Sequence, residues 1–386
     1  MKRHIITPRP NLDAAMKSIG FDFYQAEGIP YWYEGAYYEF TAREIDELEL
    51  AANTLHDMCR QAVQHVIDHR LYPLFGIEPE LVPLIEGSWG KSMQHPSLYG
   101  RFDFIYDGNS PPKMLEYNAD TPTSLFEASI VQWYWLEALF PDFAERGGQF
   151  NSLHESMVAR WRQLLLGQRD RNLYFTCLTP QPEDETTTKY IASTACEAGW
   201  EGQFIPLQDI GWNDDASEFR DLGERRIGRL FKLYPWEWLA REQYGRNVIA
   251  SEINIIEPAW KMILSNKNIL PVLWELYPGH ENLLEAHSSP RPFEGRAYVS
   301  KAALGREGSN VTIYDESHTI IASADGAYAD SGLIYQEFCE PPLYDGAIRP
   351  NLGVWIVGGT AHGMGVREDD NLIVGNMSRF VPHIFR

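Results

Sequence analysis

The spacing of hydrophobic residues changes between two periods along the chain, which predicts a mixed fold of helices and strands. Apolar residues recur at three- and four-residue spacing from Thr41 to about His69, and this period is typical of an amphipathic helix. Thr41 followed three residues later by Glu44 has the form of a capping box and predicts where that helix begins. A second helix is expected from Ser124 to Phe140.

Two short runs, Phe102–Tyr106 and Lys113–Tyr117, predict a β-hairpin, because an Asp-Gly and a Pro-Pro dipeptide stand between them. Residues two apart on a strand share a face, so Glu116 and Asn118 point the same way. If the two runs pair through the turn, Asp103 lies near both.

The second half of the chain predicts further strands. Between 172 and 240, strand, helix and strand alternate, which is typical of a small α/β layer with parallel strands. From 257 to 386 we expect a helix pair, a strand–loop–strand unit rich in Gly, a strand entering a Pro-rich turn, and a hairpin followed by a strand at 371–374. No GxGxxG motif follows the first strand of the α/β layer, so a dinucleotide site is not indicated.

Composition narrows the class of protein. A length of 386 residues predicts two or three closely packed subdomains, and 44% hydrophobic residues are enough to fill their cores. The net charge of −21 disfavours binding to nucleic acid or to an anionic membrane. It would favour a cationic substrate, although acidic surfaces also simply keep proteins soluble. No apolar run has the length of a signal peptide or a membrane span, so a cytoplasmic location is expected.

The cysteines and the histidines of the first long helix show no metal-binding spacing. We expect buried free thiols in a reducing compartment, and we expect the histidines to be surface or core residues, since they do not form HExxH. The residues concerned are Cys59, Cys177, Cys196, Cys339, His56, His65 and His69.

The predicted hairpin carries a candidate metal site. Two carboxylates, Asp103 and Glu116, and the amide oxygen of Asn118 form an all-oxygen ligand set, which suits Mg²⁺. Carboxylates this close would raise each other's pKa, and a cation gives a reason for the cluster. The alternative is a hairpin whose acids are exposed to solvent.

The strand–loop–strand unit carries a candidate phosphate site. Lys301 precedes the sequence GREGSN, whose backbone N–H groups could bind phosphates, although the loop is not a Walker A motif and is also typical of a tight hairpin turn. Arg306 in this loop and Arg367 are candidates to neutralise a transferring phosphoryl group.

Taken together, the motifs resemble the synthetase domain of the glutathionylspermidine synthase family. The motifs that carry the resemblance occur in family order between about residue 20 and residue 386: RFDF, EYNADTPTS, KLYPWEW, EPAWK, LSNKNILPVLW, GREGSN, YQEF and VREDD. The resemblance implies an α/β (α+β) protein with an ATP-grasp fold in a permuted, glutathione-synthetase-like arrangement. Residues 1–386 would form one synthetase unit, with an inserted pre-ATP-grasp-like subdomain at about 172–240 and the main nucleotide-binding part at about 257–386.

The resemblance also implies the reaction. In the family, ATP phosphorylates the glycine carboxylate of glutathione, and an amine of spermidine then displaces phosphate from the acyl phosphate. The larger family members carry an additional N-terminal amidase domain with a catalytic Cys. Because this sequence starts at the synthetase part, we expect it not to hydrolyse the amide.

Roles follow for the positions that match. Asp103, Glu116 and Asn118 would hold two Mg²⁺ ions. Arg101 would contact the reacting carboxylate or the γ-phosphate, Arg306 would lie beside the phosphates, Arg367 would stabilise the transferred phosphoryl group, and Ser124 would lie in the segment that meets glutathione. The residues expected to bind ATP are Lys267, Lys301, Glu307, Gly308, Gln336, Glu337, Phe338, Cys339 and Leu372.

One position departs from the family pattern. The polyamine-binding members have an acid near the position of Arg379, and an exposed Arg would repel a cationic amine by about 1 kcal/mol at 4 Å. A different amine or an amino acid is therefore an alternative acceptor. Two further alternatives are a nucleotide-binding regulatory protein without ligase activity and a metal-dependent hydrolase that uses Asp103 and Glu116.

Overall fold

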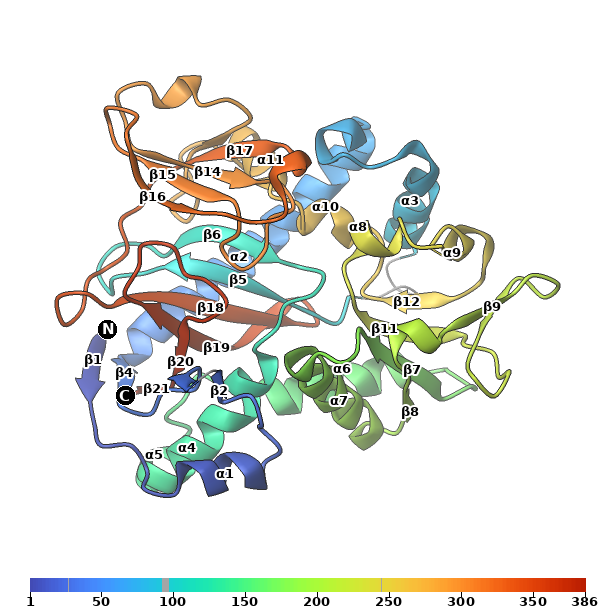
Figure 1. The fold of residues 1–386 in the computed structure, drawn as a ribbon, viewed down its shortest axis with the longest axis horizontal. Coiled ribbons are helices and arrows are strands. Elements are labelled where there is room, and N and C mark those ends of the chain that lie inside the picture. Colours follow the sequence, from blue (N-terminus) through green and yellow to red (C-terminus); the bar gives the residue numbers. More distant parts are fainter. Residues whose placement is uncertain (27, 92–96, 244) are drawn as a thin grey trace.

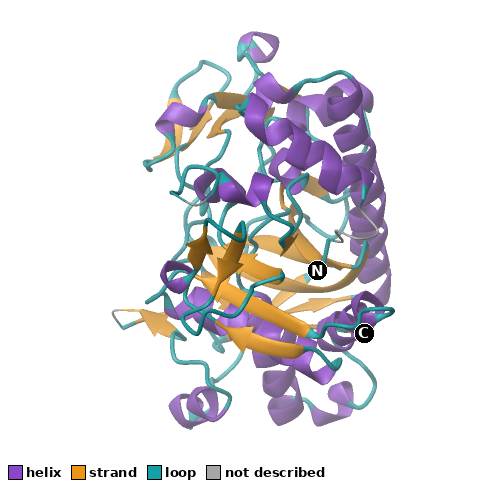
Figure 2. Ribbon diagram, turned by 90° about the vertical axis from the view of Figure 1, so that its right-hand side faces the viewer, coloured by secondary structure: helices purple, strands orange, loops and turns teal. Residues whose placement is uncertain are grey.

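The computed structural model describes residues 1–26, 28–91, 97–243 and 245–386. Its strands gather in the interior and most of its helices lie at the periphery (Figures 1 and 2). Three larger sheets organise the molecule: a central antiparallel sheet, a second antiparallel sheet above it in Figure 1, and a parallel sheet to one side.

The central sheet has five strands in the order β20-β19-β18-β5-β6, and each neighbouring pair is antiparallel. The predicted hairpin is present as β5 and β6. The strand bounds are β5 (Tyr99–Ile105), β6 (Lys113–Asn118), β18 (Arg349–Val357), β19 (Thr360–Asp369) and β20 (Arg379–Val381).

The two faces of this sheet differ because side chains alternate along each strand. On one face, buried Phe102, Phe104 and Val354 share a hydrophobic core with α2 (Ala42–Asp68), the longest described helix. The predicted capping box is confirmed, because the Thr41 side chain accepts from the Glu44 amide while the Glu44 carboxylate accepts from the Thr41 amide. The opposite face is left for polar side chains.

The second antiparallel sheet has the order β13-β17-β14-β15-β16. The predicted strand–loop–strand unit is β14 and β15, and the predicted helix pair is α10 and α11. The bounds are β13 (Ala286–His287), β14 (Tyr298–Ala302), β15 (Val311–Tyr314), β16 (Ile320–Ala324), β17 (Leu333–Glu337), α10 (Lys261–Leu264) and α11 (Ile269–Leu276).

The third sheet is parallel, with the order β12-β11-β7-β8, as the alternation of strands and helices after 172 predicted. The limits of a separate subdomain at 172–240 remain a prediction. The bounds are α6 (Leu153–Leu165), β7 (Asn172–Cys177), α7 (Pro182–Glu197), β8 (Glu201–Phe204), β11 (Arg229–Leu233) and β12 (Asn254–Ile256).

The remaining elements complete the layers around the sheets. Strands β1, β4 and β21 form a three-stranded sheet that brings both termini to the same side of the molecule (Figure 1). The helix expected from Ser124 to Phe140 is present as a π-helical turn (Glu127–Val131) followed by α4. The other bounds are β1 (Lys2–Ile5), α1 (Leu12–Ser18), β2 (Gln25–Ala26), β3 (Ile29–Pro30), β4 (Ala36–Phe40), α3 (Val82–Gly90), α4 (Gln132–Leu139), α5 (Pro141–Ala144), β9 (Gly211–Asn213), β10 (Glu218–Arg220), α8 (Trp236–Leu239), α9 (Asn247–Ala250) and β21 (His383–Phe385).

Two expectations were wrong. Residues 371–373 form bends and residue 374 is irregular, so no strand forms here, because Asp369 binds the backbone and side-chain amides of Asn371 and turns the chain. The thiols are all free, but Cys196 is exposed and Cys339 is half-buried, while only Cys59 and Cys177 are buried.

Within the described residues, no helix combines the length and the apolar composition needed to cross a bilayer.

A buried ion pair joins the central sheet to the segment before α10. The Lys261 ammonium lies 2.7 Å from the Glu257 carboxylate, and neither side chain is exposed to solvent. Lys261 also donates to the carbonyl oxygens of Tyr99 and Ala119, at 2.5 and 2.6 Å, next to the ends of β5 and β6. Glu257 accepts from the amides of Leu98 and Tyr99, at 2.8 and 3.0 Å. The pair therefore fixes where the hairpin lies.

Replacing this lysine tests its role in the fold. Lys261→Met leaves Glu257 as an uncompensated buried charge, so we expect a loss of about 3–5 kcal/mol in the free energy of unfolding, measured by urea denaturation. The control is Lys17→Met, which removes an exposed ion pair with Asp13 and should not change stability measurably. Equal denaturation midpoints for the Lys261 variant and the unmodified protein would contradict the assignment.

Candidate functional site

A pocket of about 220 Å³ lies between the polar face of the central sheet and the second antiparallel sheet. The structure brings to its wall all the site residues predicted from the sequence except Arg379. These are Arg101, Asp103, Glu116, Asn118, Ser124, Lys267, Lys301, Arg306, Glu307, Gly308, Gln336, Glu337, Phe338, Cys339, Arg367 and Leu372. Their individual roles remain predictions.

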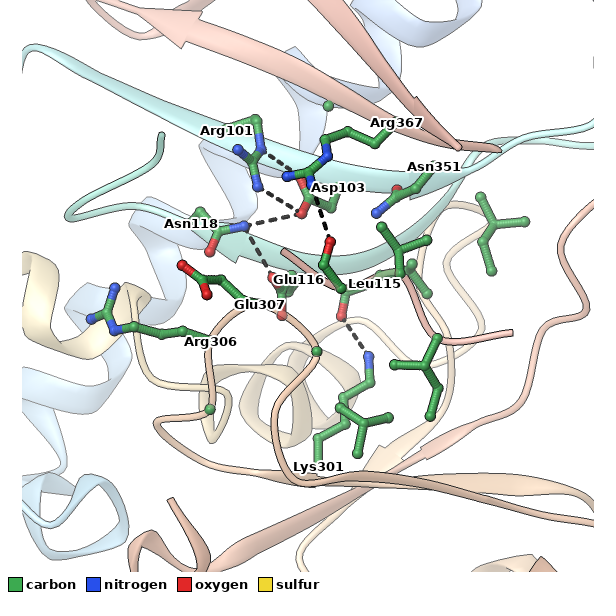
Figure 3. Close-up of a pocket in the computed structure, with 18 of the residues that line it drawn as sticks. Arg101, Asp103, Leu115, Glu116, Asn118, Lys301, Arg306, Glu307, Asn351 and Arg367 are labelled. Carbon is green, nitrogen blue, oxygen red and sulfur yellow. Dashed lines mark hydrogen bonds and ion pairs between the residues drawn. The ribbon is translucent and has the colours of Figure 1, made fainter. Parts of the chain in front are cut away.

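The hairpin places the candidate metal ligands opposite one another. In the register of β5 and β6, Asp103 pairs with Glu116, and Arg101 pairs with Asn118. The Asn118 amide nitrogen donates to Asp103 at 3.1 Å and to Glu116 at 3.0 Å (Figure 3). The side-chain cluster expected from the sequence is therefore formed by two cross-strand pairs that follow one another on the same face of the hairpin.

Positive side chains compensate both carboxylates. The Arg101 guanidinium binds both oxygens of Asp103, at 2.7 and 3.0 Å, and the Lys267 ammonium lies 2.8 Å from Glu116. Burial raises the pKa of Asp103, although Arg101 opposes the shift. Burial would also raise the pKa of Glu116, but Lys267 and Lys301 outweigh it and lower that pKa to about 2. Glu116 is thus ionised at neutral pH.

The oxygen set fits a magnesium ion. Among the described residues, no group of three or more His, Cys, Asp or Glu side chains is placed to hold a metal, and the third ligand here would be the Asn118 amide. That amide presents its nitrogen to both acids, and a half-turn of the amide group would present its oxygen instead. Gly353 leaves room for Arg101 on the same wall, because a Cβ at Gly353 would lie 2.8 Å from the Arg101 Cδ.

Lys301 faces this cluster from the second sheet (Figure 3). Its ammonium donates to the Gln336 side chain at 2.6 Å and to the Leu115 carbonyl at 3.1 Å. Burial lowers the pKa of Lys301 to about 8, while Glu116 opposes the shift. Lys301 is therefore a buried cation that ties the two sheets together across the pocket.

The loop between β14 and β15 covers one end of the pocket. Gly308 has a φ of +72°, and a Cβ there would lie 2.6 Å from the Val374 carbonyl oxygen, so the close approach of the two loops requires Gly. Arg306 donates to the Thr121 hydroxyl at 2.7 Å and to Glu237 of α8 at 2.6 Å. This arginine holds the loop against the neighbouring layer.

Arg367 extends from β19 into the pocket. One of its nitrogens donates to the carbonyls of Gly375, Asn376 and Ser378, at 3.0, 2.7 and 2.9 Å. Its guanidinium lies 5.3 Å from the centre of the Tyr31 ring. Its Nε is buried without a hydrogen-bond partner among the described residues, so one donor remains for a ligand.

Arg379 does not line the described pocket. In the register of β19 and β20, Arg379 pairs with Glu368, whereas Phe380, which lines the pocket, pairs with Arg367. Arg379 therefore points to the other side of its strand and binds Glu368 and Asp370, at 3.3 and 2.7 Å. Arg379 therefore lies outside the lining of this pocket, and its expected place beside the amine stays a prediction.

Sequence reasoning missed several polar residues of the site. Tyr31 and Glu127 are buried beside Ser124, and Asn351 lines the pocket with an amide oxygen that has no hydrogen-bond partner among the described residues. No local motif marks these residues.

An acidic group lies next to the pocket. Burial, with smaller contributions from Glu183 and Glu307, raises the pKa of Asp184 to about 7. Burial and Glu183 likewise raise the pKa of Glu307. These carboxylates carry like charges that repel one another, so a nearby cation would stabilise them.

Comparisons with known proteins agree with this geometry. Residues 3–386 match the family model described as "Glutathionylspermidine synthase preATP-grasp". The chain is 40% identical to a Haemophilus influenzae protein named "Putative acid--amine ligase", over 98% of this chain and 97% of that protein. It is 29% identical to the trypanothione synthetase of Crithidia fasciculata and 28% identical to the bifunctional glutathionylspermidine synthetase/amidase of Escherichia coli, over 84% and 90% of this chain.

The chain spans 53% and 59% of the length of the last two relatives. Among solved structures, the glutathione synthetase-like effector of Globodera pallida in its apo form matches with a TM-score of 0.60 at 13% identity, over 97% of this chain and 96% of that one. This likeness supports the fold, which is of the glutathione synthetase-like, ATP-grasp type. The family model and the H. influenzae relative cover nearly the whole sequence, so the chain belongs to the glutathionylspermidine synthase family of ATP-dependent, amide-forming ligases.

Proposed function

We propose that the protein uses ATP and Mg²⁺ to join a peptide-like carboxylic acid to an amine through an acyl phosphate. Glutathione is the proposed acid, and a cationic amine such as spermidine is the proposed acceptor. The observation that carries the proposal is the placing of two opposed carboxylates and several buried cations around one pocket. This arrangement suits a metal-bound triphosphate and a second anionic substrate.

The residues divide between the metal and the phosphates. Asp103, Glu116 and Asn118 would hold Mg²⁺, and two ions are proposed. When bound, Mg²⁺ neutralises charge on the phosphates and orients them. Lys267 and Lys301 would stabilise phosphate charge, and the free Nε of Arg367 is available to the phosphoryl group in transit.

The carboxylate of the proposed acid substrate would contact the Arg101 guanidinium. This guanidinium already donates to the Thr123 carbonyl at 2.7 Å, next to Ser124 in the predicted acid-binding segment. A carboxylate is a poor electrophile, and phosphorylation gives it a good leaving group. Such a transfer depends on positioning and charge neutralisation more than on a protein nucleophile.

The acidic group favours a cationic acceptor. Glu183 raises the pKa of both Asp184 and Glu307, and Glu307 also raises that of Asp184, so an ammonium would relieve repulsion in this group. Arg379 is bound to Glu368 and Asp370 outside the pocket, so its charge gives no reason to reject a polyamine. The similarity to a trypanothione synthetase and to a glutathionylspermidine synthetase/amidase supports the same substrates for this chain.

The experiment combines ADP release with mass spectrometry. With ATP, Mg²⁺, glutathione and a panel of amines and amino acids, we expect ADP release to require an acceptor, and we expect a product with the mass of glutathione plus spermidine minus water. ATP binding without turnover on any combination would indicate a regulatory nucleotide-binding protein. Turnover without ATP would indicate a hydrolase.

Removing the amide ligand tests the metal role. Asn118→Ala should raise the Mg²⁺ concentration required for half-maximal ADP release by about 10–100-fold while the fold is retained. Asn109→Ala, in the exposed turn of the same hairpin, is the matched control and should leave the requirement unchanged. Reduced thermal stability with an unchanged Mg²⁺ requirement would remove Asn118 from the metal site.

Removing the buried lysine tests the phosphate role. Lys301→Met keeps the apolar stem but loses a charged hydrogen-bond donor worth about 1.5–3 kcal/mol, so the Kd for Mg²⁺-ATP should rise by about 10–150-fold in calorimetric titrations. Lys189→Met, whose lysine is exposed on α7 and paired with Glu185, should bind as the unmodified protein does. Equal affinities for both variants would exclude Lys301 from the nucleotide site.

A further inference from the structure

A chain of three hydroxyl and carboxyl groups leads away from the pocket. The Tyr31 hydroxyl donates to the Glu127 carboxylate at 2.6 Å and lies 3.1 Å from the Ser124 hydroxyl. Ser124 lines the pocket, and the exposed fractions of Ser124, Tyr31 and Glu127 are 2%, 5% and 0%. A carboxylate without solvent access is therefore connected to the substrate pocket by two hydroxyl groups.

The hydrogen bonds fix the direction in which a proton can move. Because Tyr31 donates its only hydroxyl hydrogen to Glu127, its oxygen must accept from Ser124. The Ser124 oxygen keeps lone pairs with which it can accept a proton from a ligand in the pocket. The chain can thus carry a proton from the pocket to Glu127.

Glu127 is held in an unusual setting. It begins the π-helical turn Glu127–Val131, and such turns inside helices often occur at functional sites. Its Oε2 is buried and has no hydrogen-bond partner among the described residues. Ser124, at the start of the same segment, has a φ of +68°, which is uncommon for a residue with a side chain.

The charged and titratable groups that face Glu127 come from three other parts of the chain. They are Glu183 at the start of α7, Arg367 of β19 and Tyr31 before β4. Burial raises the pKa of Glu127 to about 7, and Glu183 adds to the shift, while the Tyr31 hydrogen bond and Arg367 oppose it. A carboxyl group of this kind can both accept and release a proton near neutral pH.

The proposed reaction requires such a group. An aliphatic amine is a nucleophile only in its neutral form, and its nitrogen becomes positively charged as it attacks a carbonyl carbon. That nitrogen must then lose a proton for the amide to form. The lysines and arginines assigned above to phosphates carry positive charge, and Asp103 and Glu116 are assigned to a metal, so none of these is suited to accept it. Glu183, Asp184 and Glu307 are assigned to holding the ammonium.

We propose that Ser124, Tyr31 and Glu127 form a proton relay in which Glu127 is the final acceptor of the proton released by the attacking amine. The inference rests on the proposed ligase function, and it adds a general base to it. Glu127 and Tyr31 act through Ser124, which is the one member that touches the substrate.

The atoms balance as follows. The amine nitrogen forms a bond to the acyl carbon, and the carbon–oxygen bond to phosphate breaks, so inorganic phosphate leaves with the electron pair. The proton on nitrogen passes to the Ser124 oxygen, the Ser124 proton passes to the Tyr31 oxygen, and the Tyr31 proton passes to Glu127. Glu127 returns its proton by the reverse path to solvent once the product has left.

The test compares two nucleophiles on the Glu127→Gln variant. With ATP, Mg²⁺ and glutathione, spermidine is a strong base whose nitrogen holds its proton tightly after attack, whereas hydroxylamine is a weak base whose adduct loses that proton readily to water and needs less help from a base. We expect amide formation with spermidine to fall by about 100-fold or more. Hydroxamate formation should fall by less than about threefold. A fall of equal size with both nucleophiles would overturn the relay, because it would indicate a structural or acid-binding role.

The pH profile gives a second readout. Glu127 must be ionised to accept the proton, so the rate with spermidine, expressed per neutral amine, should rise with an inflection near pH 7, and this inflection should be absent in Glu127→Gln. Tyr31→Phe keeps the ring that packs under Arg367 but breaks the chain, so it should show the same loss. Glu137→Gln changes an exposed carboxylate of α4 and is the matched control, with rates and profile unchanged.

A readout without substrate separates this inference from the proposed function. Infrared titration of the carboxyl C=O stretch should show two groups that titrate near pH 7 in the protein, Glu127 and Asp184, and only the Asp184 signal should remain in Glu127→Gln. Absence of that difference would overturn Glu127 as the acceptor. Failure of the unmodified protein to release ADP with glutathione and any amine would refute the proposed substrates, while the infrared result still decides whether Glu127 can hold the proton.

Discussion

The site depends on one electrostatic constraint: two carboxylates that face each other on a buried sheet require positive charge beside them. Asp103 and Glu116 are direct cross-strand neighbours, and water cannot screen them as it would on a surface. In the protein alone, Arg101 and Lys267 supply that charge. A divalent ion would supply more of it and would free the two cations to bind anionic substrates.

The fold meets this constraint because the two faces of the central sheet have different roles, one apolar and packed in the core, the other charged. Side chains such as Phe102 and Val354 pack towards α2 and secure the sheet, so the opposite face can hold charged groups without losing the core. Lys261 and Glu257 fix the ends of the hairpin strands, and Lys301 joins the second sheet to it. The result is a rigid wall opposite a loop-covered wall, which is the geometry that a phosphoryl transfer needs.

Elements with strong local signals could be predicted from the sequence. The capping box at Thr41 predicted the start of α2, and the turn residues predicted the β5–β6 hairpin. The two-residue alternation of strands then predicted that Asp103, Glu116 and Asn118 lie close together. Features that depend on contacts between distant parts of the chain could not be predicted from the sequence. Nothing local shows that Arg379 turns away from the pocket while Phe380 turns towards it, or that Tyr31 meets Glu127 from 96 residues away. Residues 371–374 are apolar enough to suggest a strand. They follow the turn formed by Asp369, however, and no strand forms there.

The most direct measurement of the central claim is a crystal structure with Mg²⁺ and a non-hydrolysable ATP analogue. The account predicts an ion within about 2.1 Å of oxygens from Asp103, Glu116 and a rotated Asn118 amide, bridging to the phosphates. It also predicts that Lys267 or Arg101 moves from its carboxylate towards a phosphate or a bound acid. A metal held by other residues, with the Asp103–Arg101 and Glu116–Lys267 pairs intact, would contradict it.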